Sequence, residues 1–114
     1  MSIGTTGANA AAAGLTGAGS YISLHTGDPG STGANEAAYT SGGRQSVTWP
    51  AASGGAVTWT GSIVFNVPAG TYSYWGFWSA SSGGNWVDGG ALAVPVTLAA
   101  AGTVTLTQLT VTPS

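Results

Sequence analysis

The sequence contains no cysteine and no lysine, and charged residues of either sign are scarce. The absence of cysteine excludes disulfide bonds, thiolate metal ligands and cysteine nucleophiles. Only 4% of the 114 residues are charged, whereas a typical domain has about 25%. The charged residues are Asp28, Glu36, Arg44 and Asp88. A single arginine cannot neutralise several phosphates, so ordinary nucleic-acid binding is excluded.

The sequence also shows no pattern typical of a secretory signal or of a membrane-spanning segment. Residues 1–5 contain no basic residue followed by an apolar core, so no signal peptide is predicted. The uncharged C-terminal stretch, residues 89–114, is interrupted by Pro95, Gly102 and several threonines, which do not suit a membrane-spanning helix. We therefore expect a protein that is made in the cytoplasm and does not insert into a membrane.

The chain is long enough for one domain, and its aromatic content of 10% argues against disorder. With so few charges, the surface must consist of Thr, Ser, Gly, Ala and Asn. Soluble monomers usually rely on many surface charges to resist association. We therefore expect neighbours in an assembly to cover much of this surface; the alternative is a neutral, heavily hydrated exterior.

Apolar and polar residues alternate along most of the chain after residue 20, as in half-buried β-strands. Clusters rich in Gly, Pro and Ser interrupt the alternation every eight to twelve residues or so. The pattern predicts an all-β fold: a single-domain antiparallel β-sandwich of jelly-roll or Ig-like type, with about seven or eight strands over residues 21–114. The alternating runs lie at residues 21–25, 44–49, 57–59, 63–67, 92–98, 104–106 and 108–111.

Three irregularities refine this prediction. The alternation changes phase at Gln108, which indicates a β-bulge. Pro95 interrupts the longest apolar stripe, residues 92–98, and predicts an edge strand or a bulge because proline cannot donate to a ladder.

The third irregularity is the aromatic run at residues 72–78, which exceeds what a strand with one buried face allows. Strict alternation places Tyr72, Tyr74 and Trp78 on one face and Trp75 and Phe77 on the other. One set should fill the core, and a loop, a subunit or a ligand should cover the other.

Residues 1–20 are rich in Gly and Ala and do not alternate. We expect an N-terminal arm that lies on a partner; the alternative is a flexible leader. Residues 9–14 could form one helical turn, with Asn9 as its cap and Gly14 as its stop.

Catalytic and metal-binding patterns are weak. His25 is the only histidine, and no G-x-S-x-G motif accompanies it, so we expect it to face solvent or bond within a turn. The carboxylates of Asp28, Glu36 and Asp88 lie in Gly-rich loops that do not indicate a rigid pair for glycoside hydrolysis. Asn35 could join two of them around calcium, but no EF-hand spacing occurs. We predict no enzyme activity, no cofactor and no metal.

Arg44 is the only strong cation, so we expect it to pair with Asp28 or Glu36 and thereby fix a long loop. The alternative is an arginine that binds a partner. Asp28 should also accept backbone N–H bonds in the turn that Pro29 and Gly30 close.

A set of aromatic and polar residues is typical of carbohydrate binding, in which sugar rings stack on flat side chains. Core packing is the more common role of such aromatic residues on strands. The candidates for a glycan or partner surface are Trp75, Trp78, Asn85, Trp86 and Asp88.

Several segments resemble a family of small virion proteins of tailed bacteriophages, common in phages of actinobacteria and usually described as tail-fibre or minor tail proteins. The likeness extends from about Tyr21 to Thr112. It rests on residues 21–30 (YISLHTGDPG), 33–36 (GANE), 44–49 (RQSVTW), 75–80 (WGFWSA) and 90–92 (GAL).

The resemblance implies a non-enzymatic structural protein on the exterior of the phage particle, assembled in the host cytoplasm. The small size, the arm and the lack of a shaft favour a capsid decoration protein, which would bind the major capsid protein as a homo-oligomer such as a trimer. The alternative is a minor tail, tail-fibre or baseplate protein that contacts tail proteins and the host surface, with glycan binding as one means of contact.

Overall fold

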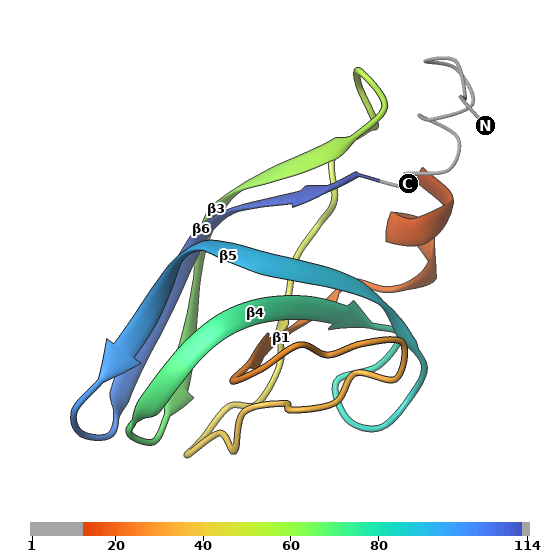
Figure 1. Cartoon of the computed structure of the whole chain (residues 1–114). Helices are drawn as coiled ribbons and strands as arrows, with labels where there is room; N and C mark the ends of the chain where they lie inside the picture. The colour runs from red at the N-terminus through yellow and green to blue at the C-terminus, as the bar shows by residue number, and fades with distance from the viewer. Residues whose placement is uncertain (1–12, 113–114) are drawn as a thin grey trace.

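Six strands and one short helix form the regular structure of residues 13–112, the part of the chain that the computed structural model describes. Strands β2, β1, β4 and β5 form a four-stranded sheet in that order, and β3 pairs with β6. Every pairing is antiparallel, and the two sheets pack face to face (Figure 1). The strands are β1 (Tyr21–His25), β2 (Gln45–Ser46), β3 (Val57–Val67), β4 (Gly70–Trp78), β5 (Trp86–Leu98) and β6 (Gly102–Val111).

The predicted all-β sandwich is confirmed, but its predicted strand number is too high for the described residues. The runs at 57–59 and 63–67 are parts of one strand, and those at 104–106 and 108–111 are parts of another. The run at 44–49 supplies only the two residues of β2. Six strands split four and two do not make a jelly-roll or an Ig-like sandwich, which use about seven or more.

The core lies between the two sheets. The β3–β6 pair contributes most of its aliphatic side chains, and the four-stranded sheet contributes most of its aromatic ones. Trp49, from the segment that precedes β3, packs edge-on against Phe77 at 5.3 Å. The fully buried large apolar side chains are Ile22, Leu24, Val57, Phe65, Val67, Tyr72, Phe77 and Val104.

The phase change at Gln108 corresponds to a register shift in the β3–β6 ladder, as predicted. Thr60 faces Gln108 and Ile63 faces Leu106, so the extra residue lies on β3 rather than on β6. Both strands bend together along their length (Figure 1). Leu106 and Leu109 lie on either side of the shift and, although three residues apart, both face the core.

A second register shift corrects the predicted faces of the aromatic run. The β4–β5 ladder is irregular between Tyr72 and Tyr74, so strict alternation fails there. Tyr72 therefore lies in the core with Trp75 and Phe77, not on the outer face with Tyr74 and Trp78. Its hydroxyl donates a hydrogen bond of 2.7 Å to the Pro68 carbonyl.

Strand β5, which contains Pro95, is one of the two edge strands of the four-stranded sheet, as predicted. Tyr72 faces Val96 and Tyr74 faces Ala91, so β5 has extra residues between these two pairs. Pro95 is one of the residues of β5 in this irregular part of the ladder. Within the stripe at residues 92–98, Leu92, Val96 and Leu98 pack against the core, whereas Val94 is 75% exposed.

The predicted helical turn at residues 9–14 lies mostly outside the described residues. Residues 13–18 are helical, so Gly14 does not stop the helix. The segment contacts the sandwich: Leu15 packs against the core, and the Gly19 carbonyl accepts a hydrogen bond of 2.8 Å from the Trp49 indole. Residues 1–12 of the predicted arm lie outside the described part. No helix among residues 13–112 is long and apolar enough to cross a membrane.

Replacement of Phe77 by Ala should lower the free energy of unfolding by about 3–5 kcal/mol, because it leaves a cavity between Trp49 and Trp75. Val94→Ala is the control on an exposed position and should change the free energy by less than about 0.5 kcal/mol. Urea denaturation of both variants measures the difference. Equal stability of the two variants would contradict this core assignment.

Candidate functional site

The long loop between β1 and β2 covers the outer face of the four-stranded sheet. Ile22 and Leu24 of β1 face the core, so Ser23 and His25 point to the opposite face, where this loop lies. Backbone hydrogen bonds attach the loop to β1: the Thr26 N–H donates to the Asn35 carbonyl, and the Ala37 N–H donates to the Leu24 carbonyl. The family-like segments 21–30, 33–36 and 44–49 therefore lie in or beside one structural unit.

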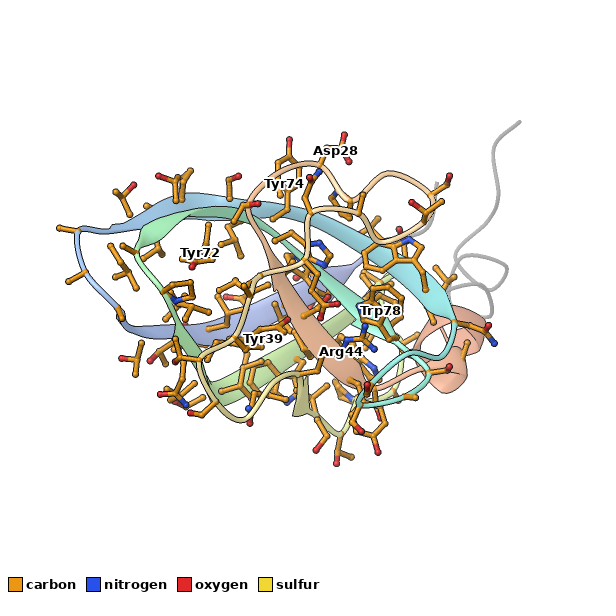
Figure 2. All side chains as sticks on the ribbon, turned by 90° about the horizontal axis from the view of Figure 1, so that it is seen from below. Asp28, Tyr39, Arg44, Tyr72, Tyr74 and Trp78 are labelled. Atoms are coloured by element: carbon orange, nitrogen blue, oxygen red, sulfur yellow. The ribbon has the colours of Figure 1, made fainter. Side chains whose placement is uncertain are left out.

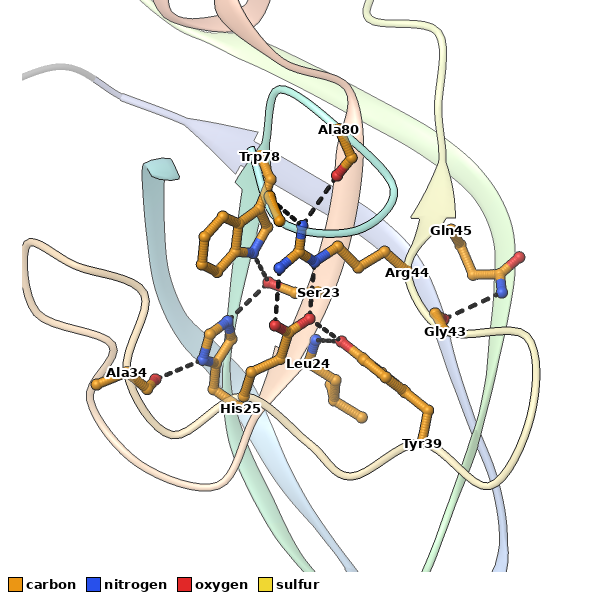
Figure 3. Close-up of polar contacts among 12 residues, drawn as sticks. Ser23, Leu24, His25, Ala34, Tyr39, Gly43, Arg44, Gln45, Trp78 and Ala80 are labelled. Carbon is orange, nitrogen blue, oxygen red and sulfur yellow. Dashed lines mark hydrogen bonds and ion pairs between the residues drawn. The ribbon is translucent and has the colours of Figure 1, made fainter. Parts of the chain in front are cut away.

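A chain of hydrogen bonds runs through β1 and ends in the loop (Figure 3). The Trp78 indole N–H donates to the Ser23 hydroxyl at 2.9 Å, and this hydroxyl lies 2.6 Å from Nε2 of His25. Nδ1 of His25 lies 2.7 Å from the Ala34 carbonyl. Because a carbonyl only accepts, Nδ1 carries the proton and Nε2 accepts from Ser23. His25 thus bonds the loop, one of the two roles expected for it.

The surroundings of His25 favour its neutral form. Burial lowers the pKa of His25 below its ordinary value, although the hydrogen bond to the Ala34 carbonyl opposes this shift. Ser23 and His25 are both 0% exposed, so the expected solvent-facing alternative is wrong. No substrate reaches the Ser23 hydroxyl in this arrangement, and the Ser–His contact holds the loop rather than a reacting group.

Arg44 forms a two-pronged ion pair with Glu36. Nε of Arg44 lies 2.8 Å from Oε2 of Glu36, and Nη2 lies 2.9 Å from Oε1. The arginine side chain is 7% exposed and that of the glutamate is 23% exposed. Such a planar, bidentate arrangement combines charge with fixed geometry.

The same guanidinium joins two further elements. Nη1 donates to the carbonyls of Ala80 and Gly83, at 2.9 and 2.8 Å, in the loop between β4 and β5. The central carbon lies 3.8 Å from the centre of the Trp78 ring, which is a cation–π contact. Arg44 therefore ties the β1–β2 loop, the β4–β5 loop and β4 together (Figure 3).

Tyr39 completes this cluster. Its hydroxyl accepts a hydrogen bond of 3.0 Å from the Leu24 N–H and donates one of 2.9 Å to Oε2 of Glu36. Burial and the neighbouring carboxylate both raise the pKa of Tyr39. Burial alone would raise the pKa of Glu36, but the hydrogen bonds from Arg44 and Tyr39 lower it below its ordinary value. Glu36 is consequently a stable anion at neutral pH.

Asp28, the other partner expected for Arg44, is exposed at the outer end of the loop (Figure 2). Its Oδ1 accepts a hydrogen bond of 2.8 Å from the Gly30 N–H, and its backbone carbonyl accepts one of 3.0 Å from the Asn35 amide. Asn35 adopts a positive φ of 61°, a conformation that asparagine tolerates. Asp28 thus shapes the turn and does not contact Arg44.

The five residues of the predicted glycan surface do not form one platform. Trp75 is only 6% exposed and lies in the core, so it offers no face for stacking. Trp78 and Trp86 pack edge to face at 5.2 Å on the opposite side of the sheet. Arg44 and the loop around Gly33 cover Trp78, and a Cβ atom at Gly33 would clash with both of these rings. Asn85 is exposed and Asp88 half-buried.

Ser23, Tyr39 and Gly33 belong to this cluster but were not predicted. Ser23 lies two residues from His25 in the alternating run at residues 21–25, a spacing that puts both on one face, and Gly33 has a φ of 77° that favours glycine. Tyr39 gave no local signal, because its contacts with Leu24 and Phe65 come from strands distant in sequence. Among the described residues, no group of three or more His, Cys, Asp or Glu side chains gathers to hold a metal ion.

Replacement of Arg44 by Ala should lower the free energy of unfolding by about 3 kcal/mol. This is the lower end for breaking a buried pair, because Glu36 keeps some contact with water. Arg44→Lys keeps the positive charge but cannot form the bidentate pair with Glu36, so it should be destabilised less than Arg44→Ala. Asp28→Asn is the control outside the pair. Chemical denaturation compares the three variants, and a loss near zero for Arg44→Ala contradicts the anchoring role.

The lowered pKa values predict a loss of stability in acid in two stages. When the pKa of a group is lower in the folded state, the unfolded chain takes up a proton at a higher pH than the folded chain does. The free energy of unfolding therefore decreases as the pH is lowered through this range. The contribution of His25 should be complete above its ordinary pKa of 6.5 and decrease below it. That of Glu36 should be complete above 4.5 and decrease below that value.

Stability measured from pH 8 to 3 in the variants His25→Gln and Glu36→Gln tests these assignments. The first variant should lack the decrease that begins near pH 6.5, and the second should lack much of the decrease below pH 4.5. If His25→Gln retains the full decrease between these values, the buried neutral histidine is not its source.

The comparison with known families bears on the chain as a whole. The family model described as Podophage GP4 fiber I protein gp80 matches residues 5–113. No curated protein matches the chain significantly. The match includes the β1–β2 loop, both sheets and the Arg44–Glu36 pair. The expected likeness to phage virion proteins is confirmed at the level of a fibre family, while the restriction to phages of actinobacteria stays a prediction. The chain belongs to the Podophage GP4 fiber I protein gp80 family, which makes it a virion component.

Proposed function

We propose that this protein is a non-enzymatic structural subunit of a phage tail fibre and contacts the host surface from the outside of the particle. The observation that carries the proposal is the fibre family match over residues 5–113. A match of this extent includes every strand of the sandwich, so the proposal concerns the whole fold and not a short motif.

The surface chemistry supports a role in assembly. Arg44 and Glu36 neutralise each other inside the molecule, and Asp28 and Asp88 are the remaining charged side chains. The exposed strand positions are chiefly Thr, Ser, Ala and Gly, with Val64 as one of two exposed large apolar residues among the described ones. Contacts with other virion proteins then rest on hydroxyl groups, backbone groups and apolar patches.

The fibre proposal reverses the preference for capsid decoration. That preference rested on the missing shaft and on an N-terminal arm, and residues 1–12 of the arm lie outside the described part. The family description names a fibre protein and makes no mention of the capsid. Homo-oligomers, including a trimer, remain compatible with either position.

Immunogold electron microscopy of intact particles, with antibody against this chain, tests the proposal. Label at the tail supports it, and label over the head supports capsid decoration instead. The absence of label from every particle overturns both assignments. Particles from a phage that lacks the gene provide the control for antibody specificity.

Attachment of the protein to the particle should depend only weakly on salt, because few charges are available to be screened. Particles washed in 0.05 M and in 1 M sodium chloride should retain similar amounts of the chain on quantitative immunoblots. A several-fold loss at high salt would instead indicate an interface built on ion pairs.

A further inference from the structure

One side of the sandwich is open. Strands β5 and β6 are joined by a short loop and then diverge, each in a different sheet (Figure 1). Two adjoining hollows, of about 320 and 220 Å³, lie between these strands and share Trp75 and Thr110 in their walls. The larger one reaches the lower limit of typical ligand pockets. We call the two hollows together the β5–β6 groove.

The groove exists because β5 presents small or charged residues to the core. Asp88 is paired with Phe77 and Gly90 with Trp75. Directly opposed residues share one face of a sheet, so Asp88 and Gly90 face the core side, as Phe77 and Trp75 do. An apolar side chain at either position would close the groove. Trp75 and Phe77 lie beneath the groove, where Phe77 is 0% exposed and Trp75 only 6% exposed.

Two polar groups enter this groove. Nε1 of Trp75 lies 3.6 Å from the place where a Cβ atom of Gly90 would be. Within residues 13–112 this N–H has no hydrogen-bond acceptor. No fully enclosed side-chain nitrogen or oxygen in this part of the chain lacks a partner, so the Trp75 N–H is not fully enclosed and reaches the groove. Asp88 accepts one hydrogen bond, from the Gly89 N–H to Oδ1 at 2.8 Å. Its second oxygen remains as an acceptor.

We propose that the β5–β6 groove binds a neutral saccharide unit. A hydroxyl group can accept from the Trp75 N–H and donate to the Asp88 carboxylate, whereas the C–H groups of a sugar ring can contact Ala91, Leu92 and Ala93 in the wall of the larger hollow. Asp88 repels an acidic ligand, and the guanidinium of Arg44 is engaged with Glu36. The proposal rests on the proposed function for the source of the saccharide, which is the host surface.

An added β-strand suits the groove less well, although β5 is an edge strand. An inward-facing charge such as Asp88 is a feature that protects sheet edges from pairing with other strands. A strand laid over it would bury the carboxylate without a cation. The small ligand leaves part of the carboxylate in water.

Titration calorimetry of the purified full chain with a panel of neutral oligosaccharides tests the proposal directly. The wild type should show saturable binding to at least one of them, and acidic oligosaccharides built from uronic acids should bind at least tenfold more weakly. Asp88→Asn should reduce the difference in affinity between neutral and acidic oligosaccharides, because it removes the negative charge and keeps a hydrogen-bond acceptor.

Gly90→Val should weaken binding at least tenfold by filling the groove. The substitution suits the fold, since Gly90 lacks a positive φ and its Cβ position has ordinary contact distances. Trp75→Phe removes the N–H and keeps an aromatic ring, and should weaken binding several-fold. Thr105→Val, on an exposed position of β6 outside the groove, is the matched control and should bind as the wild type does.

The proposal is overturned if no neutral oligosaccharide binds at concentrations up to about 10 mM, well above a millimolar Kd. It is also overturned if Gly90→Val, shown to be folded by circular dichroism, binds as tightly as Thr105→Val. Preferential binding of choline would indicate a cation site, and binding of an extended peptide would indicate strand addition. Immunogold label at the tail together with absent saccharide binding overturns this inference and leaves the proposed function intact.

Discussion

The ion pair between Arg44 and Glu36 is the contact on which the outer half of the molecule depends. It is two-pronged, and the same guanidinium also bonds the β4–β5 loop and lies on the Trp78 ring. A buried arginine is tolerable only when its charge is balanced and its N–H groups have acceptors. Here one carboxylate and two backbone carbonyls meet that requirement, and in doing so they fix two loops against one sheet.

Two layers therefore cover the four-stranded sheet. Its inner face packs on the β3–β6 pair through apolar side chains, and its outer face holds the polar network of Ser23, His25 and Tyr39. Because the only strong cation is used inside this network, the exterior is left almost free of charge. A neutral exterior rich in hydroxyl groups agrees with a subunit that packs among others in a phage fibre.

The two sides of the sandwich differ in whether a long chain segment covers them. The long segment between β1 and β3 closes one side, and Trp49 and Tyr39 fill it against the rings of Phe77 and Phe65. On the other side no such segment lies among the described residues, and Asp88 and Gly90 leave a hollow between β5 and β6. An open side of this kind is the natural place for recognition, since core packing does not occupy it.

The sequence alone determined the strand content, the phase change at Gln108 and the edge position of the strand with Pro95, because each depends on local spacing or on the chemistry of one residue. Only the tertiary structure decided that Arg44 pairs with Glu36 and not Asp28, that Tyr72 lies in the core, and that Val94 of the apolar stripe is exposed. These outcomes depend on which strands meet and where a ladder shifts by one residue. Periodicity within one strand cannot specify its partner, so side-chain faces beyond a bulge and pairings across long loops are fixed only when the sheets assemble.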